Sequence, residues 1–290
     1  MNEEQRNHLL ESRFTRPQAI AIAAKNRRLH EATGPNERLL IVAADHAARG
    51  ALDVGANPSA MSNRYDMLER LVTALAIPGV NGVLGTPDVI EDLLLLGALE
   101  KKYVFGSMNR GGLPGAVFEM DDRFTSYTAE AIVHFKLDGG KMLLRINLDD
   151  AGTAKTLESC AHAVTQLAAE NRIAMIEPFM SSRVDGHIQH DLSTDAVMRS
   201  MAIASALGAT SSHTWLKVPV VEDMERVAEA TTMPLLLLGG PRSDRPDEMF
   251  DHWEKTLRLP GVRGLVVGRN LLYPSDDDVM TAVKTAVSLL

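Results

Sequence analysis

The chain has 290 residues, 45% of them hydrophobic and 23% charged, so it can bury a sizeable core without a metal or a disulfide. Its formal charge of −8 argues against partners such as nucleic acid or an anionic membrane, which require a basic surface. The single cysteine, Cys160, excludes a disulfide framework, and the longest apolar runs are far shorter than the ~20 residues of a membrane span. We therefore expect a cytoplasmic protein.

The pattern of apolar residues predicts alternating strands and helices along almost the whole chain. Residues 3–29 form a helical pattern within an N-terminal extension that we place at residues 1–38. After it come eight short runs that are nearly continuously apolar, as in parallel strands buried on both faces. The predicted strands are residues 39–44, 82–85, 103–107, 141–147, 173–178, 214–220, 234–239 and 264–268.

Amphipathic stretches between these runs predict helices that cover the strands. Examples are residues 64–76, 154–170 and 195–208, and the tail from Val279 supplies an eighth helix. Eight strand–helix units without a break in composition favour one closed (β/α)₈ barrel, a TIM barrel, over a doubly wound sheet. We therefore predict a single domain over residues 1–290.

One connection, residues 107–127, is unusually long. Long loops in compact domains are often lids, binding loops or contact surfaces, and a variable surface insertion is the alternative. The sequence leaves these possibilities open.

In a (β/α)₈ barrel the active site lies at the carboxyl ends of the strands, because the loops after the strands converge there. This rule selects a set of candidate residues from the predicted strands. They are Asp45, His46, Asn109, Arg110, Arg145, Asn147, Glu177, Lys217, Gly239, Gly240, Gly268 and Arg269.

Lys217 is the most informative candidate because it interrupts the apolar run TWLKVPV. Period-two alternation places it on one face with Trp215, while Leu216 and Val218 point the other way. If that face is the barrel interior, burial lowers the lysine pKa and leaves more free amine to attack a carbonyl carbon. A lysine that pairs with a carboxylate or extends to the barrel mouth is the structural alternative.

The loops after the last two strands predict a phosphate site. Gly239 and Gly240 follow one strand, and Gly268 and Arg269 follow the other. Glycines let backbone N–H groups approach phosphate oxygens, and arginine adds a charge-assisted contact. We therefore expect a phosphorylated small-molecule substrate, with glycines that only form turns as the alternative.

Metal chemistry is a weaker interpretation of the histidines. His46, His187 and His190 fall near the barrel mouth, whereas His213 starts its strand at the opposite end. The HIQH segment has the character of a solvated turn more than of a ligand set. We predict no metal and no cofactor.

Five strings carry a resemblance to a known superfamily: DGGKMLLRINLDD (138–150), MIEPFMSS (175–182), TWLKVPVVEDM (214–224), PLLLLGGP (234–241) and GVRGLVVGRNLL (261–272). In this order the chain resembles the class I aldolases, which act through a lysine Schiff base. The nearest members are tagatose-bisphosphate and sulfofructose-phosphate aldolases. The chain is also similar to an aldolase-like barrel family of bacterial inositol-utilisation clusters.

The resemblance implies roles for four residues. Lys217 matches the Schiff-base lysine, Lys141 a second active-site lysine, Glu177 a proton-handling carboxylate and Asp45 the acidic residue that ends the first strand. The chain departs from the archaeal-type fructose-bisphosphate aldolases because Phe179 and Met180, and no tyrosine, follow the fifth strand.

The residues themselves leave two of these roles open. Lys141 opens its predicted strand, about 13 Å below Arg145 at about 3.3 Å per residue, so it either lowers the pKa of Lys217 or forms an ion pair at the barrel floor. Asp45 either transfers protons or neutralises a lysine.

The predicted function is a class I aldolase for a phosphorylated sugar or sugar acid. The best candidate reaction splits 5-dehydro-2-deoxygluconate 6-phosphate into dihydroxyacetone phosphate and malonate semialdehyde, with Arg145 or Arg110 binding the substrate carboxylate. Deoxyribose 5-phosphate and ketose bisphosphates stay open as substrates. The alternatives are a phosphosugar isomerase or epimerase that uses Glu177 as a base, and a non-catalytic sugar-phosphate-binding protein. We expect a homo-oligomer.

Overall fold

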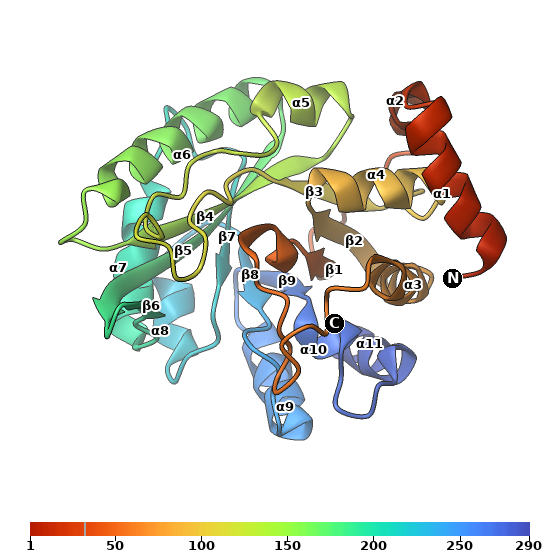
Figure 1. Cartoon of the computed structure of the whole chain (residues 1–290). Coiled ribbons are helices and arrows are strands. Elements are labelled where there is room, and N and C mark those ends of the chain that lie inside the picture. The colour runs from red at the N-terminus through yellow and green to blue at the C-terminus, as the bar shows by residue number, and fades with distance from the viewer. Residues whose placement is uncertain (32) are drawn as a thin grey trace.

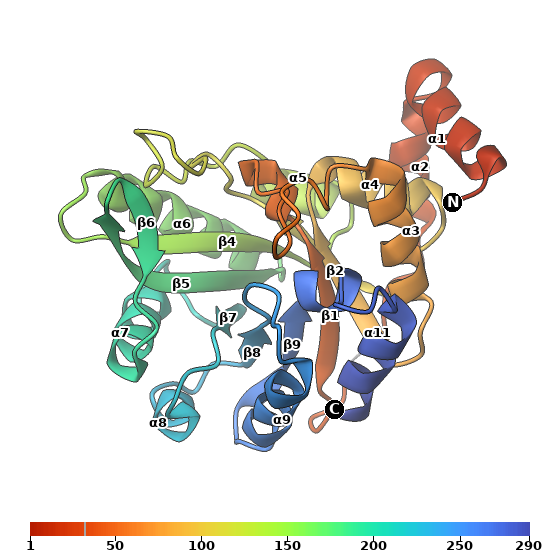
Figure 2. The same ribbon diagram turned by 60° about the horizontal axis from the view of Figure 1, so that its bottom comes forward.

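Eight parallel strands close into a barrel, as predicted from the alternating pattern (Figures 1 and 2). The computed structural model describes residues 1–31 and 33–290. β1 pairs with β2 on one side and with β9 on the other, and pairing between β4 and β5 closes the sheet. The barrel strands are β1 (Leu39–Ala44), β2 (Val80–Gly85), β3 (Tyr103–Ser107), β4 (Gly139–Ile146), β5 (Ile173–Val184), β7 (Thr214–Val218), β8 (Leu235–Leu238) and β9 (Val262–Val267).

Helices surround this barrel, and α1 and α2 lie beside α4 on its outside (Figure 1). Most helices begin at a side-chain cap or a proline, for example at Ser193 before α7 and at Pro87 in the first turn of α4. The helices are α1 (Glu3–Thr15), α2 (Gln18–Asn26), the 3₁₀ helix η1 (His46–Arg49), α3 (Arg64–Leu75), α4 (Pro87–Leu95), α5 (Ala129–His134), α6 (Gly152–Ala169), α7 (Thr194–Ser205), α8 (Met224–Glu229), α9 (Pro246–Leu257), α10 (Arg269–Leu272) and α11 (Val279–Ser288).

Strand alternation divides the core into two clusters. Leu216 and Val218 point outward and pack in the cluster beneath the helices. Trp215 points into the barrel, where its ring centroid lies 5.9 Å from that of Phe105 and 6.4 Å from that of Tyr103. Lys217 shares this inner face, so the expected orientation of the lysine is confirmed.

Lys141 does not open its strand as predicted, and of the two positions left open for it the structure shows the one close to Glu177 and Lys217. β4 begins at Gly139, and Lys141 lies in register with Ser107, the last residue of β3. Strands in a barrel are staggered, so the third residue of one strand reaches the height at which its neighbour ends. Glycine is required at residue 139 because a Cβ there would lie 2.4 Å from the Ile173 carbonyl oxygen and 2.9 Å from the ring of Phe105.

A second difference lies after β5, where the sequence suggested a solvated turn. β5 continues to Val184 and pairs antiparallel with β6 (His187–His190). Asp185 and Gly186 have φ of 49° and 82°, as the central residues of a type I′ hairpin turn require. The hairpin places His190 over the carboxyl end of the barrel.

The long connection after β3 is fixed to the barrel at several points. The amide of Asn109 donates to the Leu143 carbonyl (2.6 Å) and accepts from the Leu143 N–H (2.7 Å), so it pairs with β4 as a strand would. Asn109 and Phe124 also form an isolated antiparallel bridge. Val117 and Phe118 remain exposed on this loop, and its role as a lid or an interface stays a prediction.

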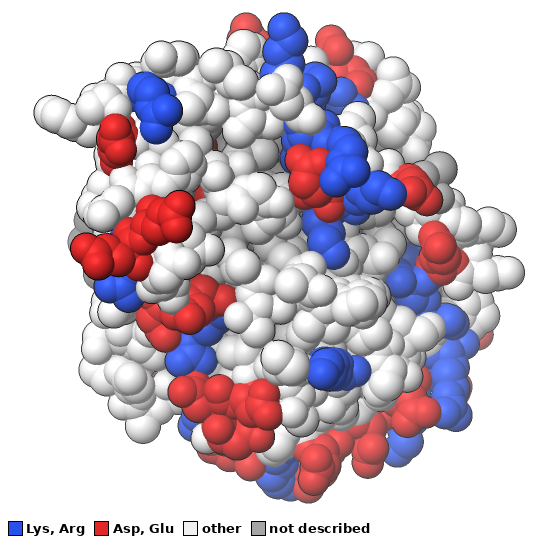
Figure 3. All heavy atoms as spheres, turned by 90° about the vertical axis from the view of Figure 1, so that its right-hand side faces the viewer, with Lys and Arg blue, Asp and Glu red and all other residues white. Residues whose placement is uncertain are grey.

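Acidic and basic side chains are interspersed over the face that carries the N-terminal helices (Figure 3). Several of them form ion pairs, such as Arg13 with Asp92 at 2.7 Å and Arg70 with Asp66 at 2.9 Å. No helix in the described parts of the chain has the length and apolar character needed to cross a bilayer.

Candidate active site

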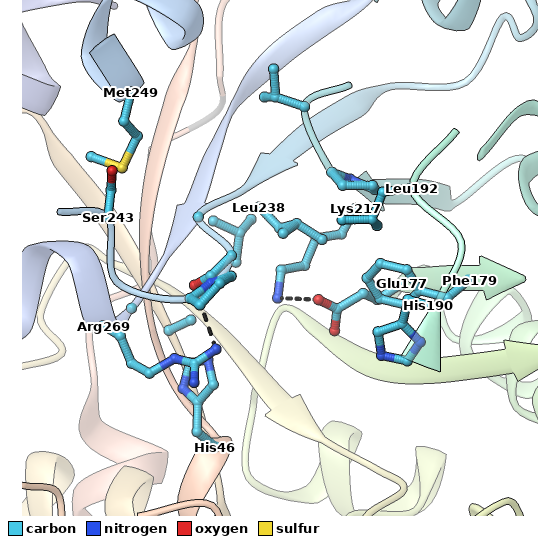
Figure 4. A pocket seen from close by; sticks show the side chains of 18 of the residues that line it. His46, Glu177, Phe179, His190, Leu192, Lys217, Leu238, Ser243, Met249 and Arg269 are labelled. Carbon is cyan, nitrogen blue, oxygen red and sulfur yellow. Dashed lines mark hydrogen bonds and ion pairs between the residues drawn. The ribbon is translucent and has the colours of Figure 1, made fainter. Parts of the chain in front are cut away.

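A cavity of about 560 Å³ opens at the carboxyl ends of the strands, where the barrel rule places an active site (Figure 4). Most of the predicted site residues line it. These are Asp45, His46, Arg110, Glu177, Lys217, Gly239, Gly240, Gly268 and Arg269.

Glu177 lies between the two interior lysines. One carboxylate oxygen is 2.9 Å from the Lys217 Nζ, and the other contacts the Lys141 Nζ. All three side chains are almost completely buried. The structure therefore brings together the two lysines and the carboxylate that the sequence selected on three different strands.

Burial and charge act in opposite directions on this cluster. Burial lowers the pKa of Lys217; Glu177 opposes that shift, and Arg110 and Arg269 add to it. The pKa of Lys141 falls well below its usual value for the same main reason, burial. Burial raises the pKa of Glu177, but Lys141 and Lys217 outweigh burial and hold the pKa well below its ordinary value.

Only Lys217 of the two lysines lines the cavity. The Lys141 side chain is 1% exposed and contacts the Glu177 oxygen that does not face Lys217. Lys217 presents its amine beside Glu177 at the cavity wall (Figure 4). A nucleophile must meet its substrate, so accessibility favours Lys217 although the environment lowers the pKa of both lysines.

Asp45 occupies the position expected of a charge partner. Its Oδ2 contacts a terminal nitrogen of Arg110, and lies 3.3 Å from Lys141 Nζ and 3.4 Å from the Ser107 hydroxyl. Ser107 in turn accepts a hydrogen bond from Arg110 Nε at 3.1 Å. Arg110 is thereby committed to Asp45 and Ser107.

The loops after β8 and β9 come together at one side of the cavity. The Asn270 amide donates to the carbonyls of Gly239 (2.7 Å) and Pro241 (3.1 Å), and its oxygen accepts from the Ser243 N–H (2.8 Å). A side chain at Gly268 would lie 2.3 Å from the Ala43 carbonyl oxygen, so glycine is required there. Sequence reasoning missed the ordering role of Asn270, although it directly follows the selected pair Gly268 and Arg269.

The structure does not place the Arg145 side chain at the cavity. Its guanidinium is 1% exposed, binds Asp122 at 2.7 and 2.9 Å, and also contacts Glu119 in the long loop after β3. Arg145 is not one of the described residues that line the cavity. The sequence correctly placed Arg145 near the mouth of the barrel, but the acidic residues of a loop far away in sequence engage the side chain first.

The histidines of the mouth are separate from one another. His190 stacks on Phe179 with ring centroids 4.3 Å apart, and its Nδ1 lies 2.9 Å from the Ser181 hydroxyl. His46 lies beside Arg269, and its Nδ1 is buried without a hydrogen-bond partner among the described residues. Across the described residues, no three histidine, cysteine, aspartate or glutamate side chains group as a metal site.

A family model for Cgl0159-like proteins matches residues 37–287. The chain belongs to the Cgl0159-like family. The crystal structure of Cgl0159 from Corynebacterium glutamicum is 57% identical, with a TM-score of 0.97, over 100% of this chain and 97% of that one. A comparison with curated proteins gave no match.

More distant solved structures share the fold. An archaeal fructose 1,6-bisphosphate aldolase is 15% identical with a TM-score of 0.65, over 93% of this chain and 98% of the other. A fructose-bisphosphate aldolase from Slackia heliotrinireducens is 16% identical with a TM-score of 0.67, over 99% and 87%. At these identities the likeness extends to the fold alone, a (β/α)₈ barrel that this chain shares with both aldolases.

Proposed function

We propose that this protein is a class I aldolase in which Lys217 forms a Schiff base with a phosphorylated substrate. The observation that carries the proposal is the buried amine of Lys217 at the cavity wall, 2.9 Å from Glu177, with Lys141 on the other oxygen of that carboxylate. The fold that the chain shares with fructose-bisphosphate aldolases supports the same assignment.

Glu177 is the group that moves protons in this proposal. Ionised Glu177 takes a proton from the Lys217 ammonium, and the free amine attacks the substrate carbonyl carbon to form a carbinolamine. The carbonyl oxygen then leaves as water, carrying two protons that came from the ammonium by way of Glu177. One N–H remains on the resulting iminium ion, so atoms and charge balance.

The iminium ion is the electron sink for cleavage of the carbon–carbon bond. Removal of the proton from the substrate hydroxyl next to that bond creates the carbonyl of the leaving aldehyde, and the bonding pair moves into an enamine on Lys217. Protonation of the enamine carbon and hydrolysis of the imine release the second product. Glu177 lies within reach of the nitrogen in each step, and Lys141 stabilises its ionised form.

Charge supports an anionic substrate. Lys141, Lys217, Arg110 and Arg269 outnumber Asp45 and Glu177 at this end of the barrel, although the whole chain has a formal charge of −8. Arg269 with the loop at Gly239 and Gly240 is the proposed phosphate site. Our candidate substrate remains 5-dehydro-2-deoxygluconate 6-phosphate.

Borohydride trapping tests the imine directly. The protein is incubated with dihydroxyacetone phosphate or with phosphosugars, reduced with borohydride, and digested for mass spectrometry. We expect the mass of the reduced adduct on Lys217, and its loss in Lys217→Met, which keeps the length and apolar stem of the side chain. Lys284→Met, at an exposed lysine of α11, is the matched control and should trap as the wild type does.

Three results decide between the proposals. An adduct that persists in folded Lys217→Met, or that appears on Lys141, contradicts the assignment. Turnover of a phosphosugar without any trapped adduct favours an isomerase or epimerase that uses Glu177 as a base. Binding without turnover or adduct favours a non-catalytic sugar-phosphate-binding protein.

A further inference from the structure

The arginines that line the cavity differ in whether a carboxylate neutralises them. Arg110 is paired with Asp45, and Arg245 binds Glu248 at 2.9 Å. Arg49 and Arg269 also line the cavity, but neither forms an ion pair within the described part of the chain. Arg269 has one long contact, 3.5 Å to the Gly240 carbonyl, and Arg49 has no side-chain hydrogen bond to a described residue.

These two arginines reach the cavity from different directions. Arg269 opens α10 after β9 and lies near the Gly239 and Gly240 loop. Arg49 ends η1 after β1, where the charge of Arg145 acts on it and its own charge acts on His190. Figure 4 shows Arg269 and His190 on opposite sides of the Lys217 amine.

The surroundings of Arg49 keep its charge available. Asp122, Glu119 and Glu177 are the carboxylates whose charge acts on Arg49; the first two already pair with Arg145 and the third pairs with Lys141 and Lys217. The neighbouring His190 adds no charge near neutrality, because burial lowers its pKa to about 4. A partly buried guanidinium without a counter-ion is costly in the empty protein, and a ligand anion would relieve that cost.

We propose that Arg49 binds a carboxylate on the substrate, at the opposite end from the phosphate that Arg269 binds. The proposal rests on the proposed function, since it places the reacting carbonyl at Lys217 between the two anionic groups. A carboxylate fits better than a second phosphate because one guanidinium balances its single negative charge, whereas a phosphate monoester carries about −1.5 to −2. The Arg49 side also lacks, within the described residues, a glycine loop like that at Gly239 and Gly240.

This assignment replaces the earlier expectation for the substrate carboxylate. Sequence reasoning placed that group on Arg145 or Arg110, and the structure commits both to protein carboxylates. Arg49 is the remaining arginine on that side of the cavity, and no strand-end rule pointed to it because it lies one turn beyond β1. The substrate class is then a phosphorylated sugar acid.

Matched ligand pairs test the proposal without requiring turnover. The two members of each pair have the same phosphate and the same chain length. At the end opposite the phosphate, one member has a carboxylate and the other has a hydroxymethyl group. The pairs are 3-phosphoglycerate and glycerol 3-phosphate, 4-phosphoerythronate and erythritol 4-phosphate, and 6-phosphogluconate and glucitol 6-phosphate. Calorimetry measures each dissociation constant for the wild type and for Arg49→Gln, Arg49→Lys, Arg269→Gln and Arg199→Gln. Arg199 is an exposed arginine of α7 and controls for loss of charge.

We expect the wild type to bind at least one acid tenfold or more tightly than its alditol. Arg49→Gln should abolish that preference and leave alditol binding unchanged, and Arg49→Lys should restore part of it. Arg269→Gln should weaken both members of a pair, and Arg199→Gln should change neither. The variants are compared only after their circular dichroism and melting temperatures match the wild type.

Other outcomes would overturn the proposal. One is that the wild type binds no acid more tightly than its alditol in any of the three pairs. Another is that a preference for the acid persists in Arg49→Gln. An Arg49-dependent preference for fructose 1,6-bisphosphate over fructose 6-phosphate, without one for the acids, would assign Arg49 to a second phosphate instead. If no imine can be trapped on Lys217 but the preference for acids over alditols remains, the aldolase assignment is refuted and the carboxylate site at Arg49 stands. Failure of the proposed function can therefore be distinguished from failure of this proposal.

Discussion

At the level of single residues, the two interior lysines show how position can decide the role of identical side chains. Both contact Glu177 and both are buried. Lys141 also lies 3.3 Å from Asp45, so two carboxylates surround it and close off its access to the cavity. Lys217 has only Glu177 as an ion-pair partner among the described residues, and transfer of one proton frees its amine.

Replacing Glu177 with glutamine tests its part in proton transfer. Glutamine keeps the shape and hydrogen bonding of the side chain but is not basic, so we expect kcat to fall by about 10²–10⁴-fold with little change in KM. Steady-state kinetics with the substrate found by trapping measures the effect. Imine formation should still be detectable with borohydride, because loss of the carboxylate removes the group that raises the pKa of Lys217.

Glu222→Gln is the matched control, because Glu222 is an exposed residue after β7 that does not line the cavity. It should leave kcat unchanged. Wild-type kcat in Glu177→Gln would remove Glu177 from the proton-transfer step and make it a charge partner of the lysines, with Asp45 as the next candidate.

Local sequence pattern was sufficient for some site residues and insufficient for others. Alternation alone placed Lys217 inside the barrel, because the inward face of a short strand depends only on its neighbours in sequence. The partners of Lys141 depend on the stagger between strands, and those of Arg145 on a loop more than 20 residues earlier in the chain. The sequence next to Lys141 or Arg145 therefore cannot predict which side chains each of them contacts.

At the level of elements, the same distinction holds. Continuous apolar runs located all eight barrel strands. The prediction nevertheless began β4 two residues too late, because Gly139 and Gly140 have low strand propensity and were left out of the strand. The β5–β6 hairpin had a sequence signal, Asp185 and Gly186 between alternating residues, which was not used.

Arg145 anchors the long loop between β3 and α5 to β4. Arg145→Met should therefore lower the free energy of unfolding by about 3–5 kcal/mol, because Asp122 and Glu119 would remain buried without their cation. Chemical denaturation measures this change. Hydrogen exchange in Arg145→Met should be faster than in the wild type, and this increase should be larger in residues 108–125 than in the rest of the molecule.

Arg258→Met is a control for the same substitution at an exposed ion pair. Arg258 and Glu254 have side chains that are 73% and 45% exposed, so their loss should cost less than about 1 kcal/mol. Equal destabilisation by the two substitutions would contradict the anchoring role. Adding Asp122→Asn to Arg145→Met should recover part of the stability if the unpaired carboxylate is the cause.

At the level of the whole molecule, charge is distributed unevenly. The chain is acidic overall, yet the cavity and the Lys141 beside it gather six basic side chains against three carboxylates: Arg49, Arg110, Lys141, Lys217, Arg245 and Arg269 against Asp45, Glu177 and Glu248. A positive cavity in an acidic protein attracts small anions to one place without favouring polyanions elsewhere on the surface.

Burial, together with these cations, should make the stability of the empty protein depend on pH through His46. Burial first, then Arg269 and Lys217, lower the pKa of His46 to about 3, whereas an unfolded histidine titrates near 6.5. Glu177 opposes this shift, and Lys141 adds to it. Between these two pKa values the unfolded chain binds a proton that the folded protein does not, so stability falls as the pH falls.

From pH 7.5 to pH 5, His46 alone should remove about 2 kcal/mol from the free energy of unfolding. His46→Gln lacks this titration, so its stability should fall by about that much less over the same interval in urea denaturation. The exposed His8 of α1, replaced by glutamine, should follow the wild-type curve. Parallel curves for the wild type and His46→Gln would show that His46 is not held neutral by its surroundings. Inorganic phosphate, bound at Arg269, should reduce the difference because an added anion offsets the positive field at the imidazole.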